Sequence, residues 1–305
     1  MDTLQRTRQL VQKVRTMELR ARRAVETGLN GTWRSVFRGR GMDFEETRPY
    51  APGDEVRTID WNVTARTGAP HVKQFAEERD LTLMLLVDVS ASTLAGSGLA
   101  GSNRELIAEI AAVLALSAER QNDAVGLVLF TDRVEGFVPP GKGREHALRI
   151  VRDVLACEPE GVGTDVGRAL DLLRAFGVRR SLALIVSDFA SLRAPFPEPL
   201  RRQLSIAQQR HDVIAIAVND AAEFEPPAIG PILLEDLESG EQVELDLRSE
   251  RVRRAWTAWA REQRVALRGG LRRLGVDLYE LRNDRPYLPE LLRMFHGAAR
   301  QEVRR

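Results

Sequence analysis

The sequence predicts an α/β fold: a doubly wound, mostly parallel sheet, preceded by an N-terminal helix and a small irregular, β-rich subdomain. From residue 81 onward, short apolar runs alternate with longer stretches of helical periodicity. The runs show no polar alternation, as expected of parallel strands covered by helices on both faces. Several runs end at a polar residue, and ligands of such folds bind at the carboxyl ends of the strands, near the switch in strand order.

The first predicted element is a helix over residues 4–27, which Gly28 ends. Its apolar stripe is thin, so we expect the helix to pack on another domain or on a partner. Residues 31–80 contain many glycines and prolines, which demand short elements. We expect strands at 42–47 and 71–75 and a short helix at 56–66.

Residues 81–305 form the second predicted domain, and residues 1–80 form the first. The predicted strands are 81–87, 125–130, 181–186, 213–218 and 276–281, and the predicted helices are 104–121, 145–156, 166–176, 199–210 and 249–274. Residues 134–138 precede two prolines and are expected to form an antiparallel edge strand. A β-hairpin insertion is predicted at 232–247, either facing a partner or forming a solvent-exposed flap.

Oxygen-bearing side chains follow three of the predicted elements. Asp88 ends the first apolar run, with Ser90 and Ser92 at alternate positions after it. Thr164 follows a glycine-rich loop ahead of a helix, and Asp188 ends a later strand. Hydroxyl and carboxylate oxygens are ligands that Mg²⁺ or Mn²⁺ accepts. Each residue alone also fits a helix cap or a turn, so the cap interpretation stays open at this point.

The pattern Asp88-x-Ser90-x-Ser92, with Thr164 and Asp188, resembles the metal-ion-dependent adhesion site of von Willebrand factor A domains. The resemblance implies that the three hydroxyls bind the ion directly. It also implies that the two carboxylates act mostly through water or from outside the first coordination sphere. One coordination position would then remain for a carboxylate of a partner protein.

A second unusual string precedes the metal pattern. It comprises Arg48, Tyr50, Pro52, Gly53, Asp54, Arg57, Asp60, Trp61 and Arg66. Pro52-Gly53 indicates a tight turn, since proline fixes φ and glycine permits positive φ. One interpretation is structural: the arginines pair with Asp54, Asp60 and Glu45 around Trp61 as the apolar anchor. The other interpretation is a second binding segment.

The combination of this string with the metal pattern resembles the bacterial family named domain of unknown function 58 (DUF58). The resemblance extends from about Leu10 to Met294. It implies an architecture that joins the Pro-Gly-Asp segment to a von Willebrand A-like domain. It further implies a MoxR-type AAA+ ATPase as the partner, in chaperone-like remodelling or in maturation of metal centres.

Composition excludes some classes of protein. The net charge of +1 over 305 residues argues against a general nucleic-acid binder. Cys157 is the only cysteine, and the start of the chain lacks an apolar signal core, so we expect a cytoplasmic protein without a transmembrane segment. Residues 1–40 hold ten Arg and Lys against three acids. This asymmetry fits either a basic face for an acidic partner or anionic membrane surface, or a codon bias toward arginine.

No enzyme signature accompanies the metal pattern. The sequence has no Gly-x-x-x-x-Gly-Lys phosphate loop and no Gly-x-Ser-x-Gly elbow. None of the four histidines follows a predicted strand beside the pattern. We therefore predict a non-enzymatic interaction module. Two alternatives stay open: a metal-dependent hydrolase, and a scaffold with an unused metal site that binds through its basic N-terminal helix.

Overall fold

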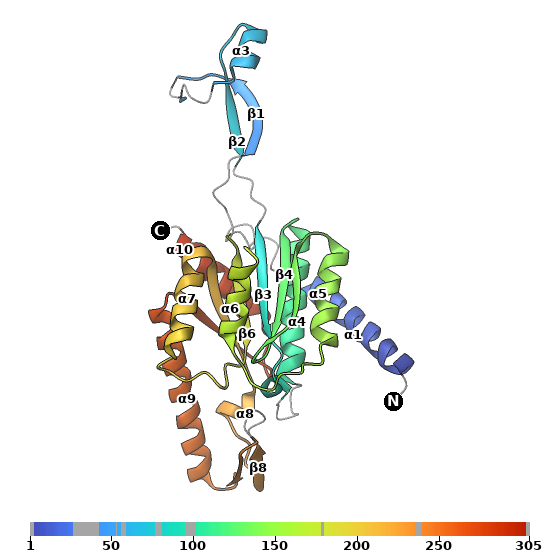
Figure 1. Cartoon of the computed structure of the whole chain (residues 1–305), viewed down its shortest axis with the longest axis vertical. Helices are drawn as coiled ribbons and strands as arrows, with labels where there is room; N and C mark the ends of the chain where they lie inside the picture. The colour runs from blue at the N-terminus through green and yellow to red at the C-terminus, as the bar shows by residue number, and fades with distance from the viewer. Residues whose placement is uncertain are drawn as a thin grey trace.

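The computed structural model describes residues 3–26, 43–52, 54–55, 59–76, 81–94, 102–177, 180–235 and 240–302. Its centre is a six-stranded sheet with the strand order β10-β7-β6-β3-β4-β5 (Figure 1). The strands are parallel except β5, which pairs antiparallel with β4 at one edge. This confirms the predicted fold class and the edge strand. The strands are β3 (Thr82–Asp88), β4 (Ala124–Phe130), β5 (Val134–Gly141), β6 (Leu182–Ser187), β7 (Asp212–Asn219) and β10 (Asp277–Arg282).

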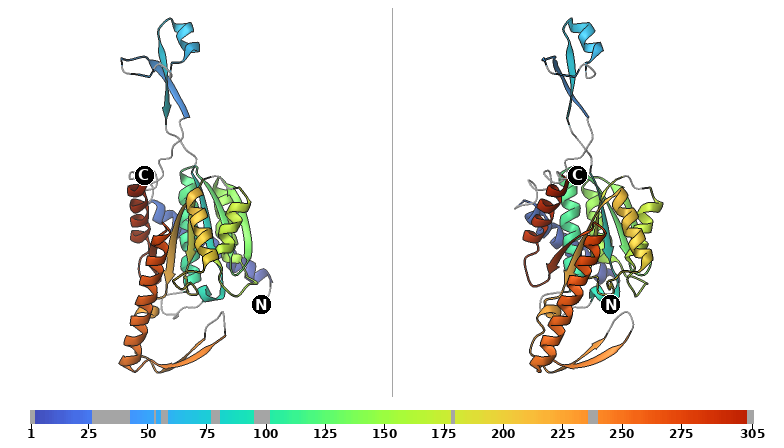
Figure 2. Two further views of the ribbon diagram at one scale, coloured as in Figure 1. Left: turned by 60° about the vertical axis from the view of Figure 1, so that its left-hand side comes forward. Right: turned by 90° about the vertical axis from the view of Figure 1, so that its left-hand side faces the viewer.

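The two faces of the sheet are covered by different helices (Figure 2). Side chains alternate along a strand, so Leu83 and Leu85 of β3 face one layer while Met84 and Leu86 face the other. The first layer consists of α1 (Thr3–Ala24), α4 (Asn103–Arg120), α5 (Arg144–Ala156) and α10 (Leu288–Glu302). The second consists of α6 (Val166–Ala175), α7 (Glu198–Arg210) and α9 (Glu250–Arg273).

Helix α1 packs on the α/β body of its own chain. Met17, Ala21 and Val25 are buried in the same core cluster as residues of α4 and α5. Glu18 adds an ion pair to Arg144 at the start of α5, with 2.7 Å between the charged atoms. The outward side of α1 leaves Val11 exposed. Packing on the α/β body agrees with the prediction that this helix packs on another domain, and it places the helix in the layer that covers the first face of the sheet.

Helix α10 is an element that the sequence analysis did not assign. Its residues Leu291, Met294 and Phe295 are buried in the first core cluster. Their spacing is helical, and Pro289 lies in the first turn, where its missing N–H costs no hydrogen bond. Two shorter elements, α8 (Ala221–Phe224) and the 3₁₀ turn η3 (Ala91–Leu94), were also not predicted.

An arm of two strands and a short helix extends away from the body (Figure 1). Strand β1 (Asp43–Pro49) pairs antiparallel with β2 (His71–Ala76), and α3 (Trp61–Thr67) lies between them in the chain. Strand β2 ends six residues before β3 begins, so the arm is attached at the amino-terminal end of β3. The two predicted strands are present, and the helix predicted at 56–66 is observed from Trp61 to Thr67, while residues 56–58 lie outside the described residues.

The arm is organised by the predicted pair of Arg48 and Asp54. The guanidinium donates two parallel hydrogen bonds, of 2.8 and 2.7 Å, to the two carboxylate oxygens. The backbone N–H of Ala51 also donates to Asp54 Oδ2, at 2.8 Å. These bonds hold the pKa of Asp54 below its usual range, chiefly through the Arg48 side chain. A bidentate pair of this kind fixes the geometry of the turn.

The expected anchoring role of Trp61 is wrong. Trp61 is 66% exposed, and the seven-residue helix α3 buries none of its residues. The physical reason is that no layer of the described part of the chain packs on α3 to bury its side chains; the helix is held by its cap, where Asp60 accepts hydrogen bonds from the N–H groups of Asn62 and Val63. Tyr50, Pro52 and Arg66 are also exposed, whereas Gly53 and Arg57 lie outside the described residues.

Replacing Asp54 by asparagine is expected to loosen the arm without unfolding the body. The amide side chain cannot accept two charge-assisted bonds from Arg48, so the turn at Ala51 should open more often. Hydrogen–deuterium exchange should show faster exchange over residues 48–55 and unchanged exchange in β3 and α4. Equal exchange of the arm in both proteins would show that the ion pair does not organise it.

The predicted hairpin insertion is confirmed. Strand β8 (Pro231–Glu235) pairs antiparallel with β9 (Gln242–Asp246), and the hairpin projects beyond the end of the body opposite to the arm (Figures 1 and 2). The first half of α9 projects beside it. The side chains of Leu233 and Val243 are 62% and 49% exposed.

Candidate metal centre

The candidate site lies where the strand order of the sheet reverses. From β3 the chain proceeds through β4 and β5 to one edge, and then through β6, β7 and β10 to the other. The reversal therefore falls between β3 and its neighbour β6. Asp88 is the last residue of β3, and Asp188 directly follows β6. The two predicted carboxylates thus flank the crevice at the carboxyl ends of these strands, where ligands of doubly wound folds bind.

Three hydroxyl groups from two loops meet in this crevice. Ser90 Oγ lies 3.0 Å from Ser92 Oγ and 2.9 Å from Thr164 Oγ1. Ser90 is buried, and its carbonyl accepts a hydrogen bond of 2.8 Å from Thr93 Oγ1 within the turn η3. That turn brings Ser90 and Ser92 to the same side, although they are two residues apart. The 3₁₀ turn is the local reason that the Asp-x-Ser-x-Ser spacing converges.

The two carboxylates are buried next to these hydroxyls. Asp88 Oδ1 accepts from the N–H of Ser90 at 2.9 Å, and Oδ2 accepts from Ser187 Oγ at 2.5 Å. Asp188 Oδ1 accepts from the N–H of Ala190 at 2.9 Å, and the Ser92 hydroxyl also bonds to this carboxylate. The structure therefore brings together all five predicted residues.

Burial raises the pKa of both acids. For Asp88, removal from water and the nearby charge of Asp188 raise the pKa to about 6, against hydrogen bonds from Ser187 and Ser90 that favour the ionised form. For Asp188 the raised pKa has burial as its largest cause. Arg264 and Arg104 lend some positive charge to Asp188 and Asp88, yet the pKa of both acids stays raised, so two ionised acids enclosed in this way are compensated only in part. A divalent cation would supply the missing positive charge.

The chemistry of the donor set fits a hard cation. The five residues offer only oxygen atoms, and hard cations such as Mg²⁺ and Mn²⁺ prefer oxygen ligands. Over the part of the chain that the structure describes, no group of three or more His, Cys, Asp or Glu side chains could hold a metal ion. The candidate centre has two carboxylates and depends on hydroxyls for the rest. These residues would hold the ion, which supplies a Lewis-acidic coordination position when bound.

The helix-cap alternative applies to a neighbouring residue. Asp165 is the N-cap of α6 and accepts from the N–H of Gly167 at 2.9 Å. Thr164 instead directs its hydroxyl to Ser90. Asp188 does accept from Ala190 two residues on, so it forms a local turn in addition to facing the crevice.

Two supporting residues escaped the sequence analysis. Ser187 donates to Asp88, although the two residues are far apart in the chain. Arg104 of α4 donates to the carbonyls of Val89 and Cys157, at 2.9 and 3.0 Å, and so connects the first metal loop to the end of α5. The position of Ser187 directly before Asp188 could have indicated its role. No local sequence pattern marks Arg104.

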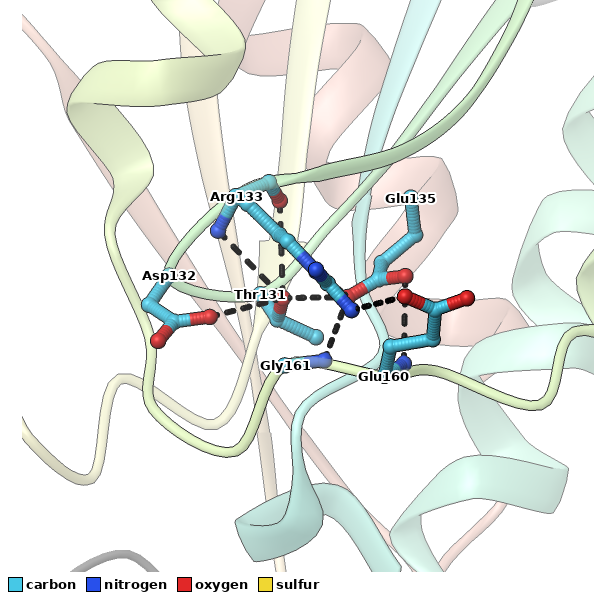
Figure 3. Close-up of polar contacts among 6 residues, drawn as sticks. All are labelled: Thr131, Asp132, Arg133, Glu135, Glu160 and Gly161. Atoms are coloured by element: carbon cyan, nitrogen blue, oxygen red, sulfur yellow. Dashed lines mark hydrogen bonds and ion pairs between the residues drawn. The ribbon is translucent and has the colours of Figure 1, made fainter.

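A third supporting residue is Glu135, near the start of β5 (Figure 3). Its Oε1 accepts hydrogen bonds from Thr131 Oγ1 and from the N–H of Gly161, both at 2.7 Å. Its Oε2 accepts from the N–H of Glu160 at 3.2 Å. Arg133 donates to the same carboxylate at 3.2 Å and also pairs with the side chain of Glu160. Glu135 thus binds the backbone of the loop that leads to Thr164.

Glu135 stays ionised in this setting. Burial favours its neutral form, but the bonds from Thr131, Gly161, Glu160 and Arg133 together outweigh burial and lower the pKa to about 2. The approach of the loop is close: a Cβ atom at Gly161 would overlap Thr131 Oγ1 and Asp132 Oδ1. An alanine at this position would therefore displace these side chains or the loop itself.

The Asp188 loop is tied to helix α9. Arg193 donates to the carbonyl of Ala190 at 2.7 Å, and its guanidinium lies over the ring of Trp259, 5.4 Å from the centroid. Further along α9, Arg264 bonds to Asn219 at the end of β7, and its positive charge favours ionisation of Asp188. Helix α9 therefore contacts the loop after Asp188 through Arg193, and it acts on Asp188 itself through the charge of Arg264.

Comparison with known proteins places the chain in a family. The profile of the family described as "Protein of unknown function DUF58" matches residues 46–266. An uncharacterised protein of Mycobacterium tuberculosis is 33% identical over 286 residues, which cover 93% of this chain and 88% of the relative. This chain is a DUF58 protein. An uncharacterised Mycobacterium avium protein is 30% identical to it over 165 residues, 53% of this chain and 94% of that protein.

Solved structures also resemble this DUF58 chain. One is the conserved hypothetical protein BatB from Bacteroides thetaiotaomicron, with 17% identity and a TM-score of 0.42, covering 72% of this chain and 99% of that one. Another is a von Willebrand factor type A protein from Catenulispora acidiphila, with 13% identity and a TM-score of 0.40, covering 75% and 44%. At these scores the likeness carries no argument about function. Within the described ranges, no helix is long and apolar enough to cross a membrane.

Proposed function

We propose that this DUF58 protein is a non-enzymatic interaction module that binds a carboxylate of a partner protein through a Mg²⁺ ion. The observation that carries the proposal is the meeting of three hydroxyls beside the two buried acids: Ser90 Oγ lies 3.0 Å from Ser92 Oγ and 2.9 Å from Thr164 Oγ1. Mn²⁺ accepts the same oxygen set, so the proposal covers both ions.

The composition of the donor set supports recognition of an anion. Hydroxyl ligands are neutral, so an ion held mainly by them keeps its net positive charge and attracts a further carboxylate. Both oxygens of Asp88 already accept hydrogen bonds, from Ser90 and Ser187. This suits a carboxylate that acts on the ion from outside the direct coordination sphere, while the hydroxyls bind it. A carboxylate from outside the chain would complete the coordination.

The resemblance to DUF58 supports the identity of the partner. We propose a MoxR-type AAA+ ATPase, with which the protein would work in the cytoplasm in chaperone-like or maturation roles. The metal centre would accept an acidic side chain of that ATPase. No specific nucleic acid is part of the proposal.

The hydrolase alternative has less support from the site. A metal-bound water needs a base beside it, and the described histidine side chains are engaged elsewhere. His146 bonds to the carbonyl of Val125 at 2.7 Å, His211 bonds to Ser181 at 2.9 Å, and His71 lies in the arm. A specific phosphoesterase activity that requires Asp188 would favour this alternative.

The test uses the purified protein and a purified MoxR-type ATPase from the same organism. Calorimetry with MgCl₂ should show one ion bound per chain. The ATPase should then bind the wild type and not the Asp188→Asn variant, both in the presence of Mg²⁺. The variant is more informative than a chelator, because nucleotide-bound ATPases themselves use Mg²⁺. Equal binding of the ATPase to both proteins would refute metal-bridged recognition.

A further inference from the structure

We propose that Glu135 is a positioning residue for the metal centre: it clamps the loop of residues 160–164 so that Thr164 is presented to the ion. This inference rests on the proposed function, because it assigns Thr164 a role toward Mg²⁺. No motif includes Glu135, which lies on the antiparallel edge strand, outside the three loops that carry the five site residues.

Several contacts with the loop converge on the side chain of Glu135. Glu135 accepts from two consecutive backbone N–H groups, those of Glu160 and Gly161, through different oxygens. Thr131, at the end of β4, contributes a third bond from its hydroxyl. The carboxylate therefore joins the β4–β5 turn to the loop that precedes α6 (Figure 3).

Only a short piece of the loop connects the clamped residues to Thr164. Two residues separate Gly161 from Thr164, and backbone bonds also hold the loop within and after this segment. The carbonyl of Val162 accepts from Ala91 at 3.4 Å, and the N–H of Asp165 donates to the carbonyl of Thr131 at 2.9 Å. With Glu135 in place, the loop is fixed before, within and after the segment that carries the hydroxyl.

The negative charge of the Glu135 carboxylate strengthens the clamp. Backbone N–H groups bonded to a carboxylate form stronger bonds than those to a neutral acceptor. The side chain of Glu135 is only 7% exposed, so water competes little for these bonds. An isosteric amide at this position would lose the charge and would turn an N–H₂ group toward at least one N–H donor.

Glu160 offers a matched control. Both Glu135 and Glu160 pair with Arg133, but the Glu160 side chain is 80% exposed, and it is the backbone of Glu160 that the clamp holds. Glu160→Gln removes one carboxylate from the same arginine and keeps the clamp. Glu135→Gln removes the clamp. A general effect of lost ion pairing with Arg133 would appear in both variants.

The experiment compares the wild type, Glu135→Gln and Glu160→Gln by two readouts. Without metal, hydrogen–deuterium exchange over residues 158–166 is expected to be at least about 10-fold faster in Glu135→Gln, with exchange in β6 and α4 unchanged. By calorimetry, the affinity of Glu135→Gln for Mg²⁺ should fall about 10- to 100-fold, as for other residues that orient metal ligands. Glu160→Gln should resemble the wild type in both.

The two readouts distinguish failure of the clamp, failure of the positioning role and failure of the proposed function. Unchanged exchange in Glu135→Gln would overturn the clamp, whether or not the protein binds metal. Faster exchange with full Mg²⁺ affinity would overturn the positioning role. Absence of Mg²⁺ binding by the wild type would overturn the proposed function and this role with it, while the exchange result would still report on the clamp. If Glu135→Gln does not fold, Gly161→Ala provides the second variant, because its Cβ displaces the same loop from Thr131.

Discussion

Replacing Ser90 by alanine is expected to reduce Mg²⁺ affinity by at least about 100-fold and to abolish metal-dependent partner binding. The hydroxyl of Ser90 is the central one of the three, in contact with both Ser92 and Thr164. A methyl group cannot coordinate a cation. Loss of a direct ligand should lower the metal affinity by more than the roughly 10- to 100-fold that follows loss of a residue that only orients the ligands. The fold should remain, because the backbone N–H of Ser90 still donates its hydrogen bond to Asp88 Oδ1. Calorimetry and circular dichroism measure the two effects.

Ser191→Ala is the matched control for this variant. Ser191 lies on the Asp188 loop but is exposed, so its loss should leave both the affinity and the fold unchanged. Strong Mg²⁺ binding by Ser90→Ala would place the ion elsewhere or show that the hydroxyl cluster is not its site. Unfolding of Ser90→Ala in buffer with chelator would instead identify the cluster as a structural element.

Replacing Phe295 by alanine is expected to lower the free energy of unfolding by about 3–5 kcal/mol, which is usual for a buried phenylalanine. Phe295 is 1% exposed and is among the largest fully buried side chains of the described part of the chain. It lies on α10, so the loss measures how strongly this C-terminal helix is integrated into the first core cluster. Urea unfolding followed by far-ultraviolet circular dichroism gives the number.

Leu233→Ala supplies the comparison for this measurement. Leu233 is a large apolar residue of the hairpin, but it is 62% exposed, so its truncation should change the stability by about 0.5 kcal/mol or less. If Phe295→Ala were equally mild, α10 would be a peripheral helix. The size of the difference therefore tests the assignment of α10 to the core.

The sheet could be predicted because its strands are apolar on both faces. The runs that became β3 and β6 are buried along almost their whole length, so a simple apolar pattern found them. The five candidate metal residues could be named because their order along the chain resembles the adhesion site of von Willebrand factor A domains. The prediction covered residue types and order; the distances between their hydroxyls came from the structure.

The supporting residues could not be predicted, for a physical reason. The partners of Glu135 are backbone N–H groups 25 and 26 residues away, and backbone groups leave no trace in a sequence. Arg104 likewise binds two carbonyls. Trp61 misled the prediction because a large aromatic residue in a core-poor segment suggests an anchor. Helix α3 buries none of its residues, so the described part of the segment has no core for Trp61 to anchor.

The attachment of the arm has a consequence for how the molecule can connect other proteins. The arm joins the amino-terminal end of β3, and Asp88 ends the same strand six residues after Thr82, about 20 Å away at the rise of a β-strand. The two ends of one strand thus serve two separate surfaces. Under the proposed function, a protein bound at the carboxyl end of β3 would leave the exposed Tyr50 and Trp61 of the arm available for a second protein. Such a two-ended tether raises the local concentration of one bound protein around the other without any contact between them.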